Sequence, residues 1–203
     1  CIRDTSDAEL ASFPCSYSTA ENMLTRAQVT KDDTLLITGA SGGVGSAAIQ
    51  LAKARGARVI AVAGDKKQQS VRDAGADRAL VRGASLEAAL GENSVNVVID
   101  LVGGEDWPEL LTILTPFGRY AVSGAIAGPI VELDLRTLYL KDQRFLGCTV
   151  LDDGVFSRLV GLIEEGDIQP LLARSFALES LSEAQAFFLD KQFTGKLVID
   201  MAL

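Results

Sequence analysis

The stretch Leu35-Leu-Ile-Thr-Gly-Ala-Ser-Gly-Gly-Val-Gly45, followed by Ser46-Ala-Ala-Ile-Gln-Leu-Ala-Lys-Ala-Arg55, decides the fold. An apolar run of strand formers ends in a cluster of glycines, and apolar residues then recur at helical spacing, at Val44, Ala47, Ala48 and Leu51. This pattern predicts a strand, a tight turn and a helix. Glycine leaves no Cβ between the turn and a ligand, and the first N–H groups of a helix have no intrahelical partner. Such a helix start suits a phosphate.

The glycine spacing satisfies three dinucleotide-binding patterns. G-x-G-x-x-G is met at Gly42 and Gly45, with Ala40 in the first place; G-x-x-G-x-x-G is met at Gly39, Gly42 and Gly45. T-G-x-x-x-G-x-G is met from Thr38 to Gly45, as in short-chain dehydrogenases. A turn that only lets the helix pack on the strand is the alternative, but the strand and helix context favours dinucleotide binding. The residues predicted to line the phosphates are Gly39, Ser41, Gly42, Gly43, Val44 and Gly45.

Composition narrows the functional classes. The net charge of −8 disfavours nucleic acid as a partner. No apolar run has the length of a membrane span and no leader-like segment opens the chain, so we expect a cytoplasmic protein with no membrane partner. The three cysteines, Cys1, Cys15 and Cys148, are widely spaced, which fits a reducing compartment. The absence of histidine excludes a Ser-His-Asp system and a self-contained zinc site. The first residue, Cys1, leads us to expect that an upstream segment is missing.

Further strands and helices alternate along the chain. We expect strands over 57–63, 78–81, 96–102, 118–123 and 144–150, with helices over 66–74 and 105–114. Alternation of this kind predicts an α/β, doubly wound Rossmann fold with a six-stranded parallel sheet. Residues 1–13 are expected to form an irregular arm. Ser18 with Glu21 matches a capping box, which predicts the start of a short helix. Asp65 and Ser180 are expected to cap two further helices. The tail holds a helix over 156–165 and a strand over 195–200 that we expect in another sheet. The predicted divisions are 1–31 (linker and connecting helix), 32–150 (dinucleotide domain) and 151–203 (segment of a substrate domain).

The end of the second strand predicts the choice of cofactor. The place of the usual ribose-binding acid is taken by Ala63, and Gly64 leaves space beside Lys66 and Lys67, which favours the 2′-phosphate of NADP(H) over NAD(H). Asp65 is the competing ribose ligand. Asp65 as a cap and the lysines as a solvated face remain alternatives. The nicotinamide floor is expected at Val102, Ser123, Gly124 and Leu146, where strands end beside small residues; each position is also compatible with an ordinary strand-ending turn.

Four segments together resemble the medium-chain dehydrogenase/reductase superfamily: Thr38–Ala61, Asp73–Asp77, Asp100–Gly104 and Gly195–Val198. The likeness covers nearly the whole chain and is to alcohol dehydrogenases of the zinc type and quinone reductases. It implies a Rossmann cofactor domain whose closing Gly-Lys-x-Val strand returns to the substrate domain. Most of the N-terminal catalytic domain of that family is expected to be absent from this chain.

The resemblance also implies roles for single residues. Lys196 is expected at the cofactor phosphates and Thr19 near the nicotinamide. Cys15, in Cys-x-x-x-Thr, is similar to the last catalytic-zinc ligand of the zinc-dependent members, so zinc is expected only in an intact protein that supplies the other ligands. The edge strand within 120–150 is a candidate homodimer contact.

The predicted function is an NADP(H)-dependent oxidoreductase that moves hydride between the nicotinamide and a small carbonyl, alcohol or quinone substrate, with this chain supplying cofactor binding and, by itself, no turnover. A short-chain dehydrogenase is disfavoured, because Tyr17, Tyr120 and Tyr139 are each followed four places later by a residue other than lysine. A nucleotide-sensing module without chemistry is the remaining alternative.

Overall fold

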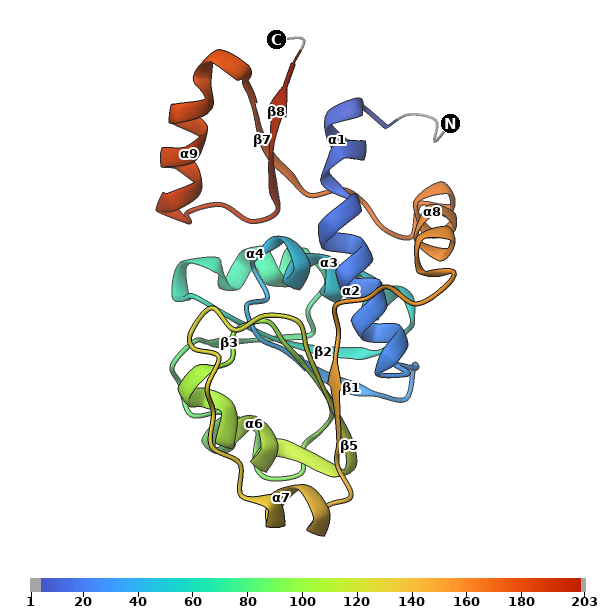
Figure 1. Cartoon of the computed structure of the whole chain (residues 1–203), viewed down its shortest axis with the longest axis vertical. Helices are drawn as coiled ribbons and strands as arrows, with labels where there is room; N and C mark the ends of the chain where they lie inside the picture. The colour runs from blue at the N-terminus through green and yellow to red at the C-terminus, as the bar shows by residue number, and fades with distance from the viewer. Residues whose placement is uncertain (1–4, 202–203) are drawn as a thin grey trace.

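A six-stranded parallel sheet forms the centre of the computed structural model, which describes residues 5–201 (Figure 1). The strand order is β3-β2-β1-β4-β5-β6, and every neighbouring pair is parallel. The strands are β1 (Thr34–Ile37), β2 (Arg58–Ala63), β3 (Arg78–Val81), β4 (Val95–Asp100), β5 (Leu114–Val122) and β6 (Arg144–Gly147). The order reverses between β1 and β4, so the predicted doubly wound sheet is confirmed.

Alternate residues of the strands point into two separate hydrophobic cores, one on each face of the sheet. Leu35 and Ile37 of β1 belong to the core on one face, and Leu36 between them belongs to the core on the other. The first face is covered by α2 (Pro14–Arg26), α3 (Gly43–Ala54), α4 (Gln68–Asp73) and α8 (Val155–Glu165); the second by α5 (Leu86–Leu90) and α6 (Trp107–Ile113). Burial on both faces explains why the central segments of these strands, such as Leu35–Ile37 and Val97–Ile99, are continuous apolar runs rather than alternating ones.

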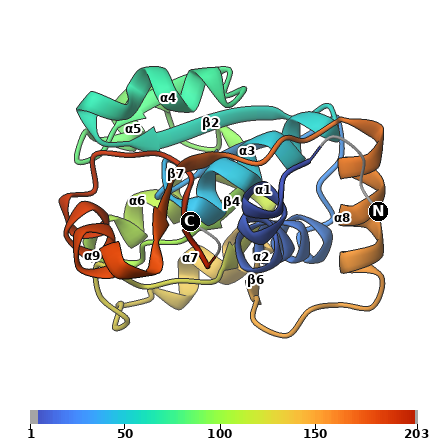
Figure 2. The same ribbon diagram turned by 90° about the horizontal axis from the view of Figure 1, so that it is seen from above.

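A second, two-stranded parallel sheet lies at one end of the molecule, as the sequence predicted for the tail. It consists of β7 (Leu172–Ala177) and β8 (Lys196–Asp200), connected through η3 (Leu178–Ser180) and α9 (Leu181–Asp190). Helix α1 (Asp7–Ser12) packs against both strands. Seen from above, β7, β8 and α1 lie over the region of α3, with α8 along one side (Figure 2). The start of α3 is therefore close to β8.

The N-terminal predictions were partly wrong. The expected irregular arm contains α1, which begins after Ser6 with the capping box that Ser6 forms with Glu9. The helix expected to start at Ser18 begins at Pro14, because proline is favoured in a first helical turn. Ser18 therefore lies inside α2 and its hydroxyl donates to the carbonyl of Pro14.

Several other boundaries also differ from the predictions. The helix expected from Lys66 begins as a 3₁₀ turn, η1 (Asp65–Lys67), and neither Asp65 nor Ser180 caps a helix with its side chain. Strand β5 begins at Leu114 rather than at residue 118, and β6 ends at Gly147 rather than at residue 150. Helix α6 is preceded by η2 (Gly104–Asp106), and α7 (Leu135–Leu140) precedes β6.

Helix α2 joins the main sheet to the second one. The Tyr17 hydroxyl donates to the carbonyl of Gln169 at 2.7 Å and accepts from the Gln50 amide of α3 at 3.1 Å. The Asn22 side chain bonds both Val150 and Asp152 in the chain that leaves β6. Burial raises the pKa of Tyr17 to about 12. These contacts fix the approach of the second sheet to α3.

Within residues 5–201, none of the helices combines the length and apolar character that a membrane crossing requires.

Candidate functional site: a dinucleotide cleft

The glycine turn leaves three backbone amides free at the start of α3. Gly39 has a φ of +57°, and the Gly42 N–H closes the turn on the Gly39 carbonyl at 3.0 Å. The first helical hydrogen bond runs from Ser46 N to Gly42 O at 2.9 Å. The amides of Gly43, Val44 and Gly45 precede it and therefore have no acceptor within the helix. Gly42 offers no side chain to cap them, so the helix start presents donors and the positive end of its dipole.

Each glycine of the turn is surrounded differently. A Cβ on Gly45 would lie 2.3 Å from the Gly39 carbonyl oxygen and 2.6 Å from the Ala40 Cα, both backbone atoms. A Cβ on Gly42 would have its nearest neighbour, the same oxygen, at 3.3 Å. Gly45 is therefore required by the packing of helix on turn, whereas a Cβ on Gly42, which is exposed, needs only a slight adjustment of the turn.

Lys196 of β8 reaches the start of α3. A Cβ on Gly43 would lie 2.9 Å from the Lys196 Cδ and 2.7 Å from the Ser16 Oγ of α2. The structure thus brings a lysine from the end of the chain to the predicted phosphate site. Among the contacts of the described residues, Ser16 rather than Thr19 reaches the glycine turn; Thr19 lies three residues further along α2, half-buried, and its role stays a prediction.

The residues predicted for the nicotinamide floor gather next to the glycine turn. The Val102 Cγ2 would lie 3.2 Å from a Cβ on Gly39, and the Leu101 carbonyl 2.7 Å from a Cβ on Gly124. Gly124 and Leu146 line a cavity of about 270 Å³ that Trp107 and Tyr120 also line. Ser123 lines an adjoining hollow of about 500 Å³ beside Arg26 and Cys148. These residues stand at the carboxyl ends of β4, β5 and β6, the edge at which doubly wound sheets bind ligands.

A buried carboxylate that the sequence analysis did not single out lies between the glycine turn and the segment that follows β4, residues 101–103. Asp100, the last residue of β4, is fully buried and accepts hydrogen bonds from the Thr38 hydroxyl at 2.5 Å and from the Val102 amide at 2.9 Å. It also accepts from the Tyr120 hydroxyl. Burial, followed by the bond to Asp100, raises the pKa of Tyr120. The signal in the sequence was an aspartate directly after the apolar run Val97–Ile99.

Cations gather at the ends of β2 and β3. Gly64 has no atom within 4 Å of its Cβ position, and Lys66 is exposed. Lys67 is half-buried and its Nζ donates to the Phe193 carbonyl at 2.7 Å, in the loop before β8. Burial lowers the pKa of Lys67, and the charges of Lys191 and Arg82 lower it further.

Arg82 and Lys191 were missed by the sequence analysis. The Arg82 amide bonds the Ala63 carbonyl at 2.8 Å, so this arginine stands directly beside the end of β2. Its signal was a basic residue following the third strand, whose carboxyl end meets that of the second at the same sheet edge. Lys191 had no local signal, because only the fold of the tail brings it there.

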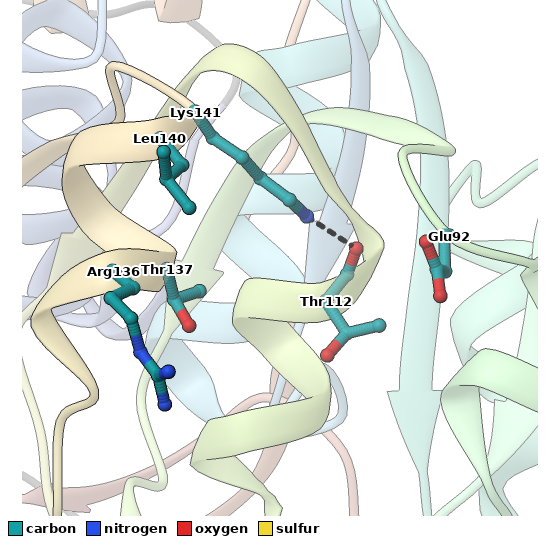
Figure 3. A pocket seen from close by; sticks show the side chains of 6 residues that line it. All are labelled: Glu92, Thr112, Arg136, Thr137, Leu140 and Lys141. Carbon is teal, nitrogen blue, oxygen red and sulfur yellow. Dashed lines mark hydrogen bonds between the residues drawn. The ribbon is translucent and has the colours of Figure 1, made fainter.

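A hollow of about 390 Å³ lies at the opposite, amino end of the sheet (Figure 3). Its lining residues come from the loop before β4, from the end of α6 and from α7 with the residue that follows it: Glu92, Thr112, Arg136, Thr137, Leu140 and Lys141. The Lys141 Nζ donates to the carbonyls of Leu111, Thr112 and Leu114 at 2.9–3.2 Å, and burial lowers its pKa. Lys141 thus caps the C-terminal carbonyls of α6, and this structural role accounts for a buried lysine beside the hollow.

Cys15 lies exposed in the first turn of α2. Within residues 5–201 there is no group of three or more acidic, cysteine or histidine side chains placed to hold a metal ion. The donor set therefore does not fit a zinc ion bound by these residues. Cys15 as a ligand completed by residues outside this chain stays a prediction.

Comparison with known proteins adds the family to this geometry. Residues 43–165 match the model of the zinc-binding dehydrogenase family. The chain belongs to that family. This membership confirms the resemblance to the medium-chain dehydrogenase/reductase superfamily and sets aside the short-chain alternative.

Individual members of the family support the same assignment. An acryloyl-coenzyme A reductase of Metallosphaera sedula is 35% identical over 196 residues, which cover 96% of this chain and 58% of the relative. The crystal structure of a putative alcohol dehydrogenase from Sinorhizobium meliloti 1021 superposes with a TM-score of 0.91 at 50% identity, covering 98% of this chain and 56% of that one. A 2-octenoyl-CoA carboxylase reductase, in complex with NADP and 2-octenoyl-CoA, has a TM-score of 0.84 at 25% identity, covering 95% and 49%. The chain thus spans somewhat more than half the length of the first two proteins and about half that of the third.

Proposed function

We propose that this chain is the NADP(H)-binding part of an oxidoreductase that transfers hydride between the nicotinamide and a carbonyl, alcohol or quinone substrate. The observation that carries the proposal is the start of α3, where the backbone of the turn leaves no room for a side chain at Gly45 and three amides lack intrahelical acceptors. A pyrophosphate placed there would accept from these amides and meet Lys196. The bound nicotinamide supplies or accepts the hydride.

The chain's own residues would orient the cofactor in this site. Val102 and Gly124 would form the surface under the nicotinamide, because the first packs on the glycine turn and the second on Leu101. Ser123 and Leu146, which line the two adjoining hollows, would border the same ring. A flat ring needs small or apolar neighbours and close backbone approach, which these positions offer.

The preference for NADP(H) over NAD(H) rests on the cations at the ends of β2 and β3. Lys66, Lys67 and Arg82 would bind the 2′-phosphate, with Gly64 leaving space for it. Lys67 would exchange its bond to the Phe193 carbonyl for one to the phosphate. The name of a relative that is solved with NADP supports the same preference. Asp65, exposed between Gly64 and Lys66, is the residue that would favour NAD(H) instead.

The substrate and the partners of the whole protein are part of the proposal. Relatives named for acryloyl-CoA and 2-octenoyl-CoA make an α,β-unsaturated carbonyl compound a suitable small-molecule substrate to test. Edge strand β6 is the candidate contact for a homodimer, as exposed apolar residues such as Val150 and Leu151 follow it. A reducing compartment such as the cytoplasm suits the free thiols of Cys15 and Cys148.

Calorimetric titration of the chain with NADPH and NADH tests the proposal. We expect tighter binding of NADPH by about tenfold or more, since a charge-assisted contact contributes about 1.5–3 kcal/mol. Tighter binding of NADH would move the ribose contact to Asp65. If neither cofactor binds, the proposed cofactor site is refuted. A module that only senses the nucleotide predicts the same titration; hydride transfer from NADPH to quinones or enones by the full-length protein separates it from an enzyme.

A further inference from the structure

One carboxylate connects the two halves of the cleft. The oxygens of Asp100 accept from the Thr38 hydroxyl at 2.5 Å and from the amides of Val102 at 2.9 Å and Gly103 at 3.2 Å. Thr38 is the last residue before the glycine turn, and the two amides belong to the segment predicted to lie under the nicotinamide. Within residues 5–201, no lysine or arginine pairs with this fully buried acid. Its oxygens are thus satisfied by hydrogen-bond donors rather than by a cationic side chain.

Thr38 also bonds the residues on either side of Asp100 in the chain. Its hydroxyl accepts from the Leu101 amide at 2.9 Å, and its own amide donates to the Ile99 carbonyl at 3.0 Å. The residue that introduces the phosphate turn is therefore bonded before, at and after Asp100. The Val102 side chain lies next to Gly39, with its Cγ2 3.2 Å from the position that a Cβ on Gly39 would take, so the glycine turn and the segment after β4 also lie side by side.

An acid is an unfavourable choice for stability alone. Apolar replacements of buried acidic groups are often neutral or stabilising, so a buried acid whose oxygens are hydrogen-bonded to several segments points to a need for defined geometry. We propose that Thr38 and Asp100 are positioning residues that hold the phosphate-binding turn and the nicotinamide floor in register, so that the two halves of the dinucleotide bind cooperatively. The inference rests on the proposed function of the cleft.

Two ligands separate the halves of the site. NADPH occupies both, whereas 2′-phospho-ADP-ribose has the same phosphates but no nicotinamide. The ratio of the Kd of 2′-phospho-ADP-ribose to that of NADPH therefore measures what the nicotinamide adds. The Thr38→Val variant is nearly isosteric and removes both hydroxyl bonds. We expect it to reduce this ratio about tenfold, while the Kd of 2′-phospho-ADP-ribose changes less than threefold.

Tyr120→Phe is the matched control. It removes the hydrogen bond that Tyr120 of β5 donates to the same carboxylate, but leaves the bonds of the Thr38 hydroxyl to Asp100 and to the Leu101 amide intact. We expect both variants to lower Tm, and Tyr120→Phe to keep the Kd ratio within twofold of the wild type. Thr38→Ser retains the hydroxyl and is expected to keep the ratio as well.

The single tryptophan, Trp107, provides a second readout, because its ring packs 4.7 Å from that of Tyr120 below the floor. NADPH should quench its emission by energy transfer, and saturated Thr38→Val should show weaker transfer than saturated wild type. Equal changes of the ratio in Thr38→Val and Tyr120→Phe, or no change in either, would overturn the inference and leave the cofactor site standing. Failure of the wild type to bind both ligands would instead refute the proposed function, and the inference with it.

Discussion

The substitution Gly45→Ala tests the packing of helix on glycine turn with one methyl group. Its Cβ would lie 2.3 Å from the Gly39 carbonyl oxygen, about 1.1 Å short of the 3.4 Å at which ordinary contact begins. The neighbours are backbone, so the start of α3 must move by about that distance. A phosphate hydrogen bond of about 2.9 Å would lengthen to about 4 Å, beyond the hydrogen-bonding range. Loss of two such bonds, at about 1.5–3 kcal/mol each, predicts NADPH binding weakened by roughly two to four powers of ten.

The matched control is Gly42→Ala, whose Cβ would meet the same oxygen at 3.3 Å and needs only a slight adjustment. We expect its Kd for NADPH to stay within about tenfold of the wild type. Both Kd values are measured by NADPH fluorescence titration on protein whose circular dichroism and Tm show a folded state, since overpacking by itself costs about 1–3 kcal/mol of stability. A Gly45→Ala protein that is folded and binds NADPH within threefold of the wild type would refute the reasoning.

Three further predictions concern single side chains. Arg82→Gln should weaken NADPH binding about tenfold and leave NADH binding unchanged in calorimetry, because the proposed site places only the 2′-phosphate next to this residue; equal losses for both cofactors would contradict this. Lys196→Met should weaken NADPH and NADH to a similar extent, about tenfold, because both carry the pyrophosphate, and a selective loss of NADPH would reassign the lysine. Between pH 10 and pH 12 the stability that Tyr17 contributes should be lost, since burial raises its folded pKa to about 12 and the unfolded chain gives up the proton first. That difference of two pH units corresponds to at most about 2.7 kcal/mol; urea denaturation should show a shallower alkaline decline for Tyr17→Phe, and an unchanged slope would exclude this source.

Local sequence signals predicted the main sheet well. A glycine cluster between an apolar strand and an apolar helix is a strong local pattern for a strand, a tight turn and a helix. Burial on both faces made the strands of the sheet visible as apolar runs. The same signals failed at Ser18, where a capping-box pattern occurs inside a helix that proline had already started. They also missed β7, because Leu-Ala-Arg-Ser-Phe-Ala, at 172–177, is only partly apolar and is paired by a strand twenty residues away.

The candidate site shows the same division. The glycines and the strand ends follow from local pattern, and the structure brings them together. The contact of Lys196 with Gly43 was expected only by resemblance, because β8 is more than 140 residues away along the chain. Lys191 and the bond between Lys67 and Phe193 had no local signal at all, since the tail places them. Asp100 was visible as a polar residue, but its hydrogen bonds to two turns depend on the order of strands β1, β4 and β5.

The central claim is that an anionic cofactor binds where β1 gives way to α3. A crystal structure of the chain with NADPH tests it most directly. We predict pyrophosphate oxygens within hydrogen-bonding distance of the Val44 and Gly45 amides, with Lys196 beside them. A nucleotide bound elsewhere, with those amides facing solvent or covered by protein side chains, would contradict the account.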